Sequence, residues 1–346
     1  MEPVREYFNE LVIRFGQGWN RFWYSASDPF SLCVMRIASG LVALYWLLTY
    51  TADLTLFFKD GGLLPTELIA DFNAEGGLNV ASLSYLSYLQ TPTELYIAHA
   101  IGALIVLFFT VGFYTRITSI LAMFVTLAYV YRAPFVTSDV ETVLVMLQFY
   151  LCLAPCGAYL SVDRWAANRR ASNDDPAEEN RPSKSYSATI SLRLIQLHVC
   201  VICLMSGLAK LTGPAQLLDV ENWINPWLSG SATWQMIGCQ VSPMVDLTFL
   251  RATPGLIQAW AHLIVAFELA FPFLIWKNLA RPLLLGIAVF MWGTLSLISG
   301  VAIFSLLMIV ANIAFVSPQF LRGMFQKNGT AATEQAANSP SAAATG

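Results

Sequence analysis

The chain has 346 residues, of which 56% are hydrophobic and only 12% are charged. An ordinary soluble domain carries about 25% charged residues, so this composition excludes that class and indicates a polytopic protein of the lipid bilayer. The net charge of -3 offers no basic surface for nucleic acid. The predicted fold class is all-α, a bundle of membrane-spanning helices.

The chain begins with a predicted amphipathic helix. Between residues 3 and 24, Tyr, Phe, Leu, Val and Trp side chains recur at helical spacing opposite Arg and Glu side chains. We interpret residues 1–30 as a segment that lies in the membrane interface, and packing on the bundle is the alternative. No secretory signal peptide is expected, because the first long apolar run begins only near Ser31 and no small-residue cleavage site follows it.

Eight apolar segments follow, each close to the roughly 20 residues that a spanning helix needs. We expect spans at 31–52, 95–114, 117–136, 140–160, 188–211, 256–276, 282–299 and 301–317. Residues 282–317 are nearly continuous in apolar character, and only Ser299 and Gly300 indicate a turn there. The prediction is therefore about eight spans, with seven or nine as the alternatives.

Basic residues test this arrangement, because Lys and Arg accumulate in short cytoplasmic loops. If both termini are cytoplasmic, thirteen basic residues fall on the cytoplasmic side. The outer side then carries three, which are Lys59, Arg132 and Arg251. This asymmetry favours an even number of spans with both termini in the cytoplasm.

Two polar tracts on the cytoplasmic side are predicted to be disordered, because neither buries enough apolar surface to fold alone. They are residues 166–187 and the tail, 321–346, which leaves 31–320 as the transmembrane domain. On the outer side, the long connections 53–94 and 212–255 carry several Phe and Trp side chains. Loops of this length commonly cover a site, and interfacial anchoring by the aromatic rings is the alternative.

The span at 188–211 carries an unusual stripe that ends in the sequence LMSGLAKLTG. Its members follow one another at spacings of three and four residues, and they are Arg193, Gln196, Cys200, Cys203, Gly207 and Lys210. Polar groups within a span face the protein interior, so the stripe should line the bundle core. The two cysteines are interpreted as small buried hydrophobes, with dithiol exchange with a quinone as the alternative.

Depth in the membrane separates the polar groups into two sets. Lys210 ends its span at the outer face, with His262 roughly 9 Å and His99 roughly 6 Å below that face at about 1.5 Å per residue. These three candidate catalytic residues can meet in one outward-facing cavity. For each histidine, a hydrogen-bonded core side chain is the alternative, and the wide spacing of the histidines gives no metal signature.

The second set lies nearer the cytoplasm. Arg36 and Arg193 are each roughly 7 to 8 Å from that side, and Glu268 lies near the middle of the membrane. We interpret Glu268 with one of these arginines as a structural ion pair that fixes helix packing. For Lys210 itself three roles compete: an interfacial anchor, a partner in an ion pair, and a reactive amine.

Five motifs follow one another between residues 25 and 320: FFKDGGLLP, YRAPFVTSDVETVLVMLQFYLCLAPCGAYLSVDRW, SGLAKLTG, NPWLSGSATW and HLIVAFELAFP. In this order they resemble the HTTM (horizontally transferred transmembrane) family, whose best understood members are the vitamin K-dependent gamma-glutamyl carboxylases. In those carboxylases a lysine in a Gly-x-Lys-Lys-Leu setting deprotonates vitamin K hydroquinone. The segment from Gly207 to Leu211 matches its second lysine, which gives Lys210 the role of base. The resemblance also implies a quinol cofactor and a bacterial inner membrane location.

The chain departs from the carboxylases in two ways. They carry a histidine upstream of a Ser-Val-Asp motif, whereas counting back from Ser161 leads to Val140, between Asp139 and Glu141, with no histidine nearby. They also continue into a large extramembrane domain, while this chain stops soon after its last expected span. It looks like the shorter bacterial type, which includes the sporulation-delaying protein B group, linked to maturation of secreted peptide toxins.

Two classes of function follow. The first is a membrane enzyme with carboxylase-like or other quinone-coupled chemistry at an outward-facing cavity, with Lys210 as base. The second is a non-catalytic membrane protein that binds, matures or exports a peptide or lipid, with a secreted peptide as partner. No phosphate-binding loop, nucleotide fold or metal centre is predicted.

Overall fold

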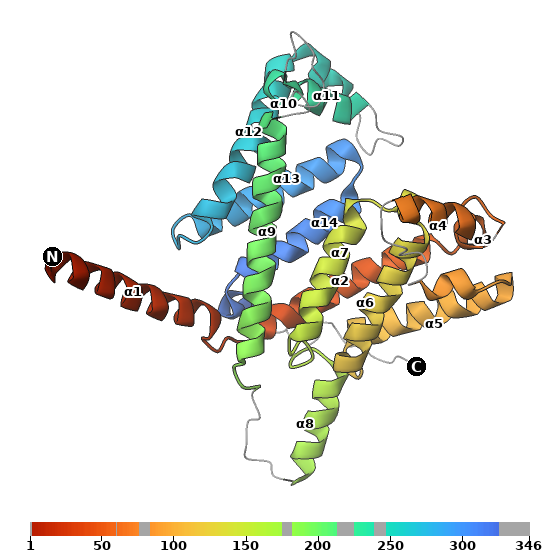
Figure 1. The fold of residues 1–346 in the computed structure, drawn as a ribbon, viewed down its shortest axis with the longest axis horizontal. Helices are drawn as coiled ribbons and strands as arrows, with labels where there is room; N and C mark the ends of the chain where they lie inside the picture. Colours follow the sequence, from red (N-terminus) through yellow and green to blue (C-terminus); the bar gives the residue numbers. More distant parts are fainter. Residues whose placement is uncertain are drawn as a thin grey trace, which may run out of the picture.

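The computed structural model describes residues 2–59, 61–75, 84–174, 182–212, 225–238 and 247–324. These residues are predominantly helical, and the only β-type contact among them is an isolated bridge between Ser27 and Ser185. The predicted all-α class is confirmed (Figure 1). A helix occupies the greater part of each of the eight expected apolar segments: α2 (Phe30–Thr49), α5 (Pro92–Val111), α6 (Thr115–Arg132), α7 (Asp139–Leu153), α9 (Tyr186–Thr212), α12 (Pro254–Leu274), α13 (Arg281–Ser299) and α14 (Ala302–Asn312).

Length and hydropathy identify a membrane protein. Four of these helices, α2, α5, α9 and α12, are long and apolar enough to cross a bilayer. A fifth candidate arises if the segments Ala302–Phe315 and Pro318–Met324, which are bent by 117° relative to each other, count as one span. By contrast, α7 has 15 residues and α14 has 11, fewer than the roughly 20 that cross the hydrocarbon unaided.

The helices form two groups that share one core. In the first, α2 packs on α5, α5 on α6 and α6 on α7; in the second, α9 packs along α12 while α13 and α14 form a hairpin. The groups join where α7 contacts α9 and where α14 contacts both α7 and α2. The turn expected at Ser299 and Gly300 is confirmed, since α13 ends there with Gly300 in the left-handed conformation at φ +70°.

Smaller helices gather at the two ends of the bundle. At one end lie α1 (Glu2–Trp23) and α8 (Val162–Asp174), on either side of the start of α9 (Figure 1). The connections at the opposite end contain α3 (Leu54–Phe58), α4 (Thr66–Glu75), the 3-10 helices η2 (Tyr85–Tyr88) and η5 (Thr248–Ala252), α10 (Pro226–Ser229) and α11 (Ser231–Gly238). We call these the α1 end and the α10 end.

The amphipathic segment at the N-terminus is helical, as the spacing predicted. Its apolar side chains Phe8, Phe15 and Trp19 are exposed, and the helix projects away from the bundle (Figure 1). Contact with the bundle is made at the last turn, where the Phe22 ring lies 5.7 Å from that of Trp276. The sequence left open that this helix packs on the bundle, and the structure shows such packing at the last turn of the helix.

The prediction of disorder over 166–187 is wrong for its first part, because α8 continues to Asp174. Arg169 lies over the Trp165 ring at 3.9 Å, one turn apart, and the Ala and Arg residues in this stretch are good helix formers. Composition alone missed this local stabilisation. Residues 175–181 and 325–346, which include most of the predicted tail, lie outside the described residues.

Candidate functional site

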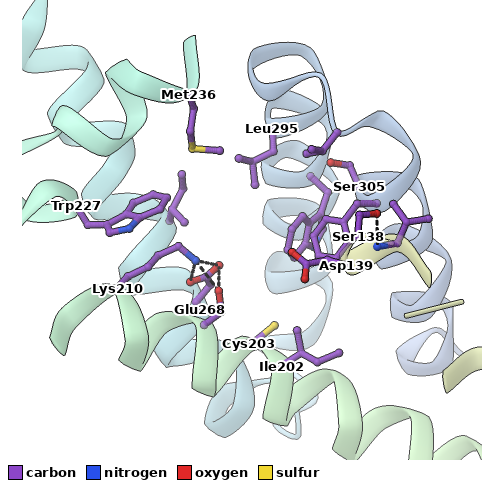
Figure 2. A pocket seen from close by; sticks show the side chains of 16 residues that line it. Ser138, Asp139, Ile202, Cys203, Lys210, Trp227, Met236, Glu268, Leu295 and Ser305 are labelled. Atoms are coloured by element: carbon purple, nitrogen blue, oxygen red, sulfur yellow. Dashed lines mark hydrogen bonds and ion pairs between the residues drawn. The ribbon is translucent and has the colours of Figure 1, made fainter. Parts of the chain in front are cut away.

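A cavity of about 340 Å³ opens at the α10 end between the α9–α12 pair and the α13–α14 hairpin. One wall comes from α9 and α12, with Trp227 of α10 and Met236 of α11 beside it; the facing wall comes from α13, α14 and the start of α7 (Figure 2). Most of the lining is apolar. A volume of this size lies within the range of small-ligand sites, which are mostly apolar with a few placed polar groups.

The principal polar feature of the cavity is an ion pair between Lys210 and Glu268. The Nζ atom of Lys210 lies 2.7 Å from both Oε1 and Oε2 of Glu268 (Figure 2). Ser206 completes the cluster, since its Oγ accepts from Lys210 at 2.5 Å and donates to Glu268 at 3.2 Å. The two charged side chains are 15% and 3% exposed. The ion pair is nearly buried and is joined by two hydrogen bonds, and its charges attract each other more strongly here than they would in water.

The local sequence explains how α9 and α12 bring these groups together. Ser206 and Lys210 are four residues apart and so lie on one face of α9. Between them, Gly207 allows close approach, because a Cβ atom there would lie 3.1 Å from the Cβ of Glu268. The stripe predicted on α9 is confirmed as inward-facing, with Gln196, Cys200, Cys203 and Gly207 buried and Arg193 and Lys210 half-buried.

Asn225 fixes the end of α9 against α10. Its Nδ2 donates to the carbonyls of Lys210 and Leu211, at 2.9 and 2.8 Å, while its Oδ1 accepts from the backbone N–H groups of Trp227 and Leu228. The Trp227 ring is thereby placed with its centroid 4.9 Å from the lysine Nζ, a cation–π contact. The Asn225 side chain thus caps the start of α10 and bonds the end of α9, and the ring of Trp227 contacts the ammonium group.

The expected ion pair of Glu268 with Arg36 or Arg193 is not formed, because Glu268 binds Lys210 instead. Arg193 donates to Gln196 and lies 4.3 Å from the centroid of the Phe22 ring. The error came from counting depth along each helix separately. The backbone of α12 passes close to Gly207 at Glu268, so the middle of α12 lies level with the last turns of α9.

Arg36 is fully buried at the α1 end, where its guanidinium donates to the carbonyls of Cys156 at 2.7 Å and Leu160 at 2.5 Å. Gly112 makes room for it: a Cβ on that residue would lie 2.7 Å from Nη1 of Arg36 and 2.5 Å from the Cβ of Ser161. Gly112 also has φ +75°, the left-handed conformation that ends α5. Arg36 therefore holds the turn after α7 through backbone carbonyls, and no carboxylate among the described residues is bonded to it.

Asp163, from the SVDRW motif, caps α6 beside this arginine. Its carboxylate accepts from the backbone N–H groups of Tyr114 and Thr115 and from the Thr115 hydroxyl, at 2.7 to 2.8 Å. Burial acts to raise the pKa of Asp163, but these hydrogen bonds outweigh it and hold the pKa below its usual range. This motif is therefore part of the helix packing at the α1 end, whereas the cavity lies at the α10 end.

The two candidate histidines do not share the cavity with Lys210. His99 is buried between α5 and α6, where its Nδ1 lies 2.7 Å from the Tyr129 hydroxyl and its Nε2 lies 3.0 Å from Thr51 Oγ1. His262 is exposed, with Nε2 at 2.9 Å from the carbonyl oxygen of Leu228. The alternative of a hydrogen-bonded core side chain therefore describes His99, whereas His262 is hydrogen-bonded but exposed, and neither ring lines the cavity around the ion pair.

The start of α7 also lines the cavity, through Ser138, Asp139 and Val140. Behind it, the buried carboxylate of Glu141 accepts from Ser138 N and Oγ at 2.7 and 2.8 Å and from Trp46 Nε1 at 2.8 Å. Ser138 and Glu141 form a capping box at the start of α7. The Ser-x-x-Glu spacing in the sequence could have revealed it.

Comparisons of the chain with protein-family models, with curated proteins and with solved structures each find no match.

Proposed function

We propose that the protein is a multi-pass membrane protein of the HTTM type, with eight spans and both termini in the cytoplasm of a bacterial cell, that binds a quinol at the cavity beside Lys210. The observation that carries this proposal is the placing of a bonded ammonium–carboxylate pair on the wall of an apolar cavity between helices. Ionisable groups in such an environment are costly and are therefore candidates for function.

The residues present fit a quinol in size and chemistry. The cavity volume suits a fused-ring head group, and the rings of Trp227, Trp292 and Phe304 in its lining provide flat apolar contacts. When bound, the quinol would supply an oxygen-bound proton and, once deprotonated, a reducing anion. The chain must supply a group that accepts this proton. Once protonated, the Lys210 ammonium would hold the quinol anion by charge attraction.

The pair itself provides a route to a free amine. Lys210 Nζ is hydrogen-bonded to both carboxylate oxygens of Glu268 and to the Ser206 hydroxyl. When a ligand excludes water from the cavity, transfer of the Lys210 proton to Glu268 gives a neutral amine and a neutral acid, which a dry site tolerates better than isolated charges. The amine then accepts a proton from the bound hydroxyl group.

A specific observation favours the second class of function. Lys210 Nζ already bonds both carboxylate oxygens of Glu268, and an ammonium is a binding group for a carboxylate or phosphate. A non-catalytic protein that binds and matures a peptide or lipid would use the same pair for recognition. The two classes differ in whether an arginine can replace the lysine, because a guanidinium binds anions but does not deprotonate in proteins.

The experiment is incorporation of labelled CO2 by purified membranes supplied with a reduced naphthoquinone, comparing the parent with Lys210→Arg and Lys210→Ala. We expect both variants to lose incorporation when compared at equal amounts of folded, membrane-inserted protein. Lys277→Arg, at the exposed α12–α13 turn, is the matched control and should keep parental activity. Incorporation retained by Lys210→Arg would exclude Lys210 as the base, and no incorporation by the parent would leave the binding function.

A further inference from the structure

The wall of the cavity opposite the ion pair carries two polar groups that the proposed chemistry does not use. Trp292 on α13 and Ser305 on α14 both line the cavity, and they are 5% and 1% exposed. Neither Trp292 Nε1 nor Ser305 Oγ has a hydrogen-bond partner within the part of the chain that the structure describes. A buried donor without a partner costs about 1–3 kcal/mol, so two on one cavity wall require an explanation.

The same two residues also line a groove on the other side of the α13–α14 hairpin. This groove has a volume of about 440 Å³ and includes Phe290 and Leu306, which are 57% and 48% exposed. Exposed apolar side chains of this kind on a membrane protein face lipid. Gly293 lies in the groove, and a Cβ added there would meet no atom within 4 Å. Trp292 and Ser305 thus stand between the cavity and a lipid-facing groove.

We propose that Trp292 and Ser305 form a second ligand-binding subsite, which binds an oxygen acceptor of a membrane-dissolved ligand whose apolar chain leaves through the groove between α13 and α14. The ligand class is an alkyl quinone, because the two cavity walls each present donors across an apolar space. Lys210 on the near wall and the pair Trp292 and Ser305 on the far wall can each bind one oxygen of such a ring. Figure 2 shows Lys210 and Ser305 on the two walls. This inference rests on the proposed function and adds the residues that orient its substrate.

A binding experiment tests the subsite directly. The probe is a tritiated 1,4-naphthoquinone with a saturated alkyl chain, added to the full chain in lipid nanodiscs, with empty nanodiscs as background. We expect Trp292→Phe and Ser305→Ala each to weaken binding about 3- to 10-fold, the effect of losing one hydrogen bond. An alkyl naphthalene with the same chain and no oxygen atoms should bind parent and variants equally.

Matched controls separate this role from a general effect of the substitutions. Ser191→Ala removes another buried hydroxyl without a described partner, outside the cavity, and Trp276→Phe removes an indole N–H that donates to the Pro272 carbonyl. Both should bind the quinone as the parent does. Without ligand, Ser305→Ala should unfold at the parental temperature or above, because it loses no hydrogen bond within the protein.

Gly293→Leu tests the path of the chain. It should weaken binding of the alkyl quinone at least fivefold while leaving the quinone without a chain unaffected, since the new side chain fills the groove and not the cavity. Saturable binding by the parent that stays within twofold in Trp292→Phe and Ser305→Ala would overturn the subsite alone. No saturable binding by the parent would overturn the proposed quinol function, and this inference with it.

Discussion

Removing either partner of the Lys210–Glu268 pair should destabilise the protein by unequal amounts. Lys210→Met leaves the Glu268 carboxylate, 3% exposed, with Ser206 as its one remaining hydrogen-bond donor among the described residues. Breaking a buried pair in this way costs about 3–5 kcal/mol. Glu268→Gln keeps an oxygen that accepts from Lys210, whose ammonium is 15% exposed and also contacts the Trp227 ring, so we expect about 1–3 kcal/mol.

The double variant Lys210→Met with Glu268→Gln distinguishes an ion pair from two independent contacts. It leaves no buried charge, so its loss should be smaller than the sum of the single losses by at least about 1 kcal/mol. The measurement is the free energy of unfolding in mixed detergent micelles, followed by far-ultraviolet circular dichroism. Lys277→Met, on an exposed lysine, serves as the control and should change stability little. Strictly additive losses, or a larger loss for Glu268→Gln than for Lys210→Met, would refute this reasoning.

Three further predictions concern the α1 end and the topology. Gly112→Ala should lower the free energy of unfolding by about 2–4 kcal/mol, the sum of left-handed strain and overpacking, whereas Gly286→Ala, whose Cβ meets no atom, should not destabilise. Asp163 has a folded pKa below its unfolded value of about 3.9, so it stabilises the fold above that pH and the stabilisation is lost as pH falls through the folded pKa. Asp163→Asn should therefore lower stability at pH 7, and a pH titration of the unfolding midpoint should show a weaker acid transition than the parent. Reporter fusions after Arg170 and at the C-terminus should read cytoplasmic and a fusion near Asn225 external, and a reversal at either would exclude the proposed eight-span arrangement.

Some site residues were accessible from the sequence and others were not. Lys210 could be found because it ends a stripe at helical spacing in an otherwise apolar segment, a pattern that depends on one helix alone. Asn225, Trp292 and Ser305 gave no such signal. Each is an ordinary residue in its own segment, and its place beside the cavity depends on how the helices pack together.

The sequence by itself determined the positions of the apolar helices, the turn at Gly300 and the inward face of α9, because hydrophobic patterning and backbone preferences act within a single segment. The tertiary structure decided which charges meet. Depth counted along each helix placed Glu268 with Arg36 or Arg193, but how far one helix is shifted along another depends on close packing between them. Here the contact of Gly207 with α12 sets that shift, so Glu268 faces Lys210 across the cavity wall while Arg36 bonds to backbone carbonyls at the other end of the bundle.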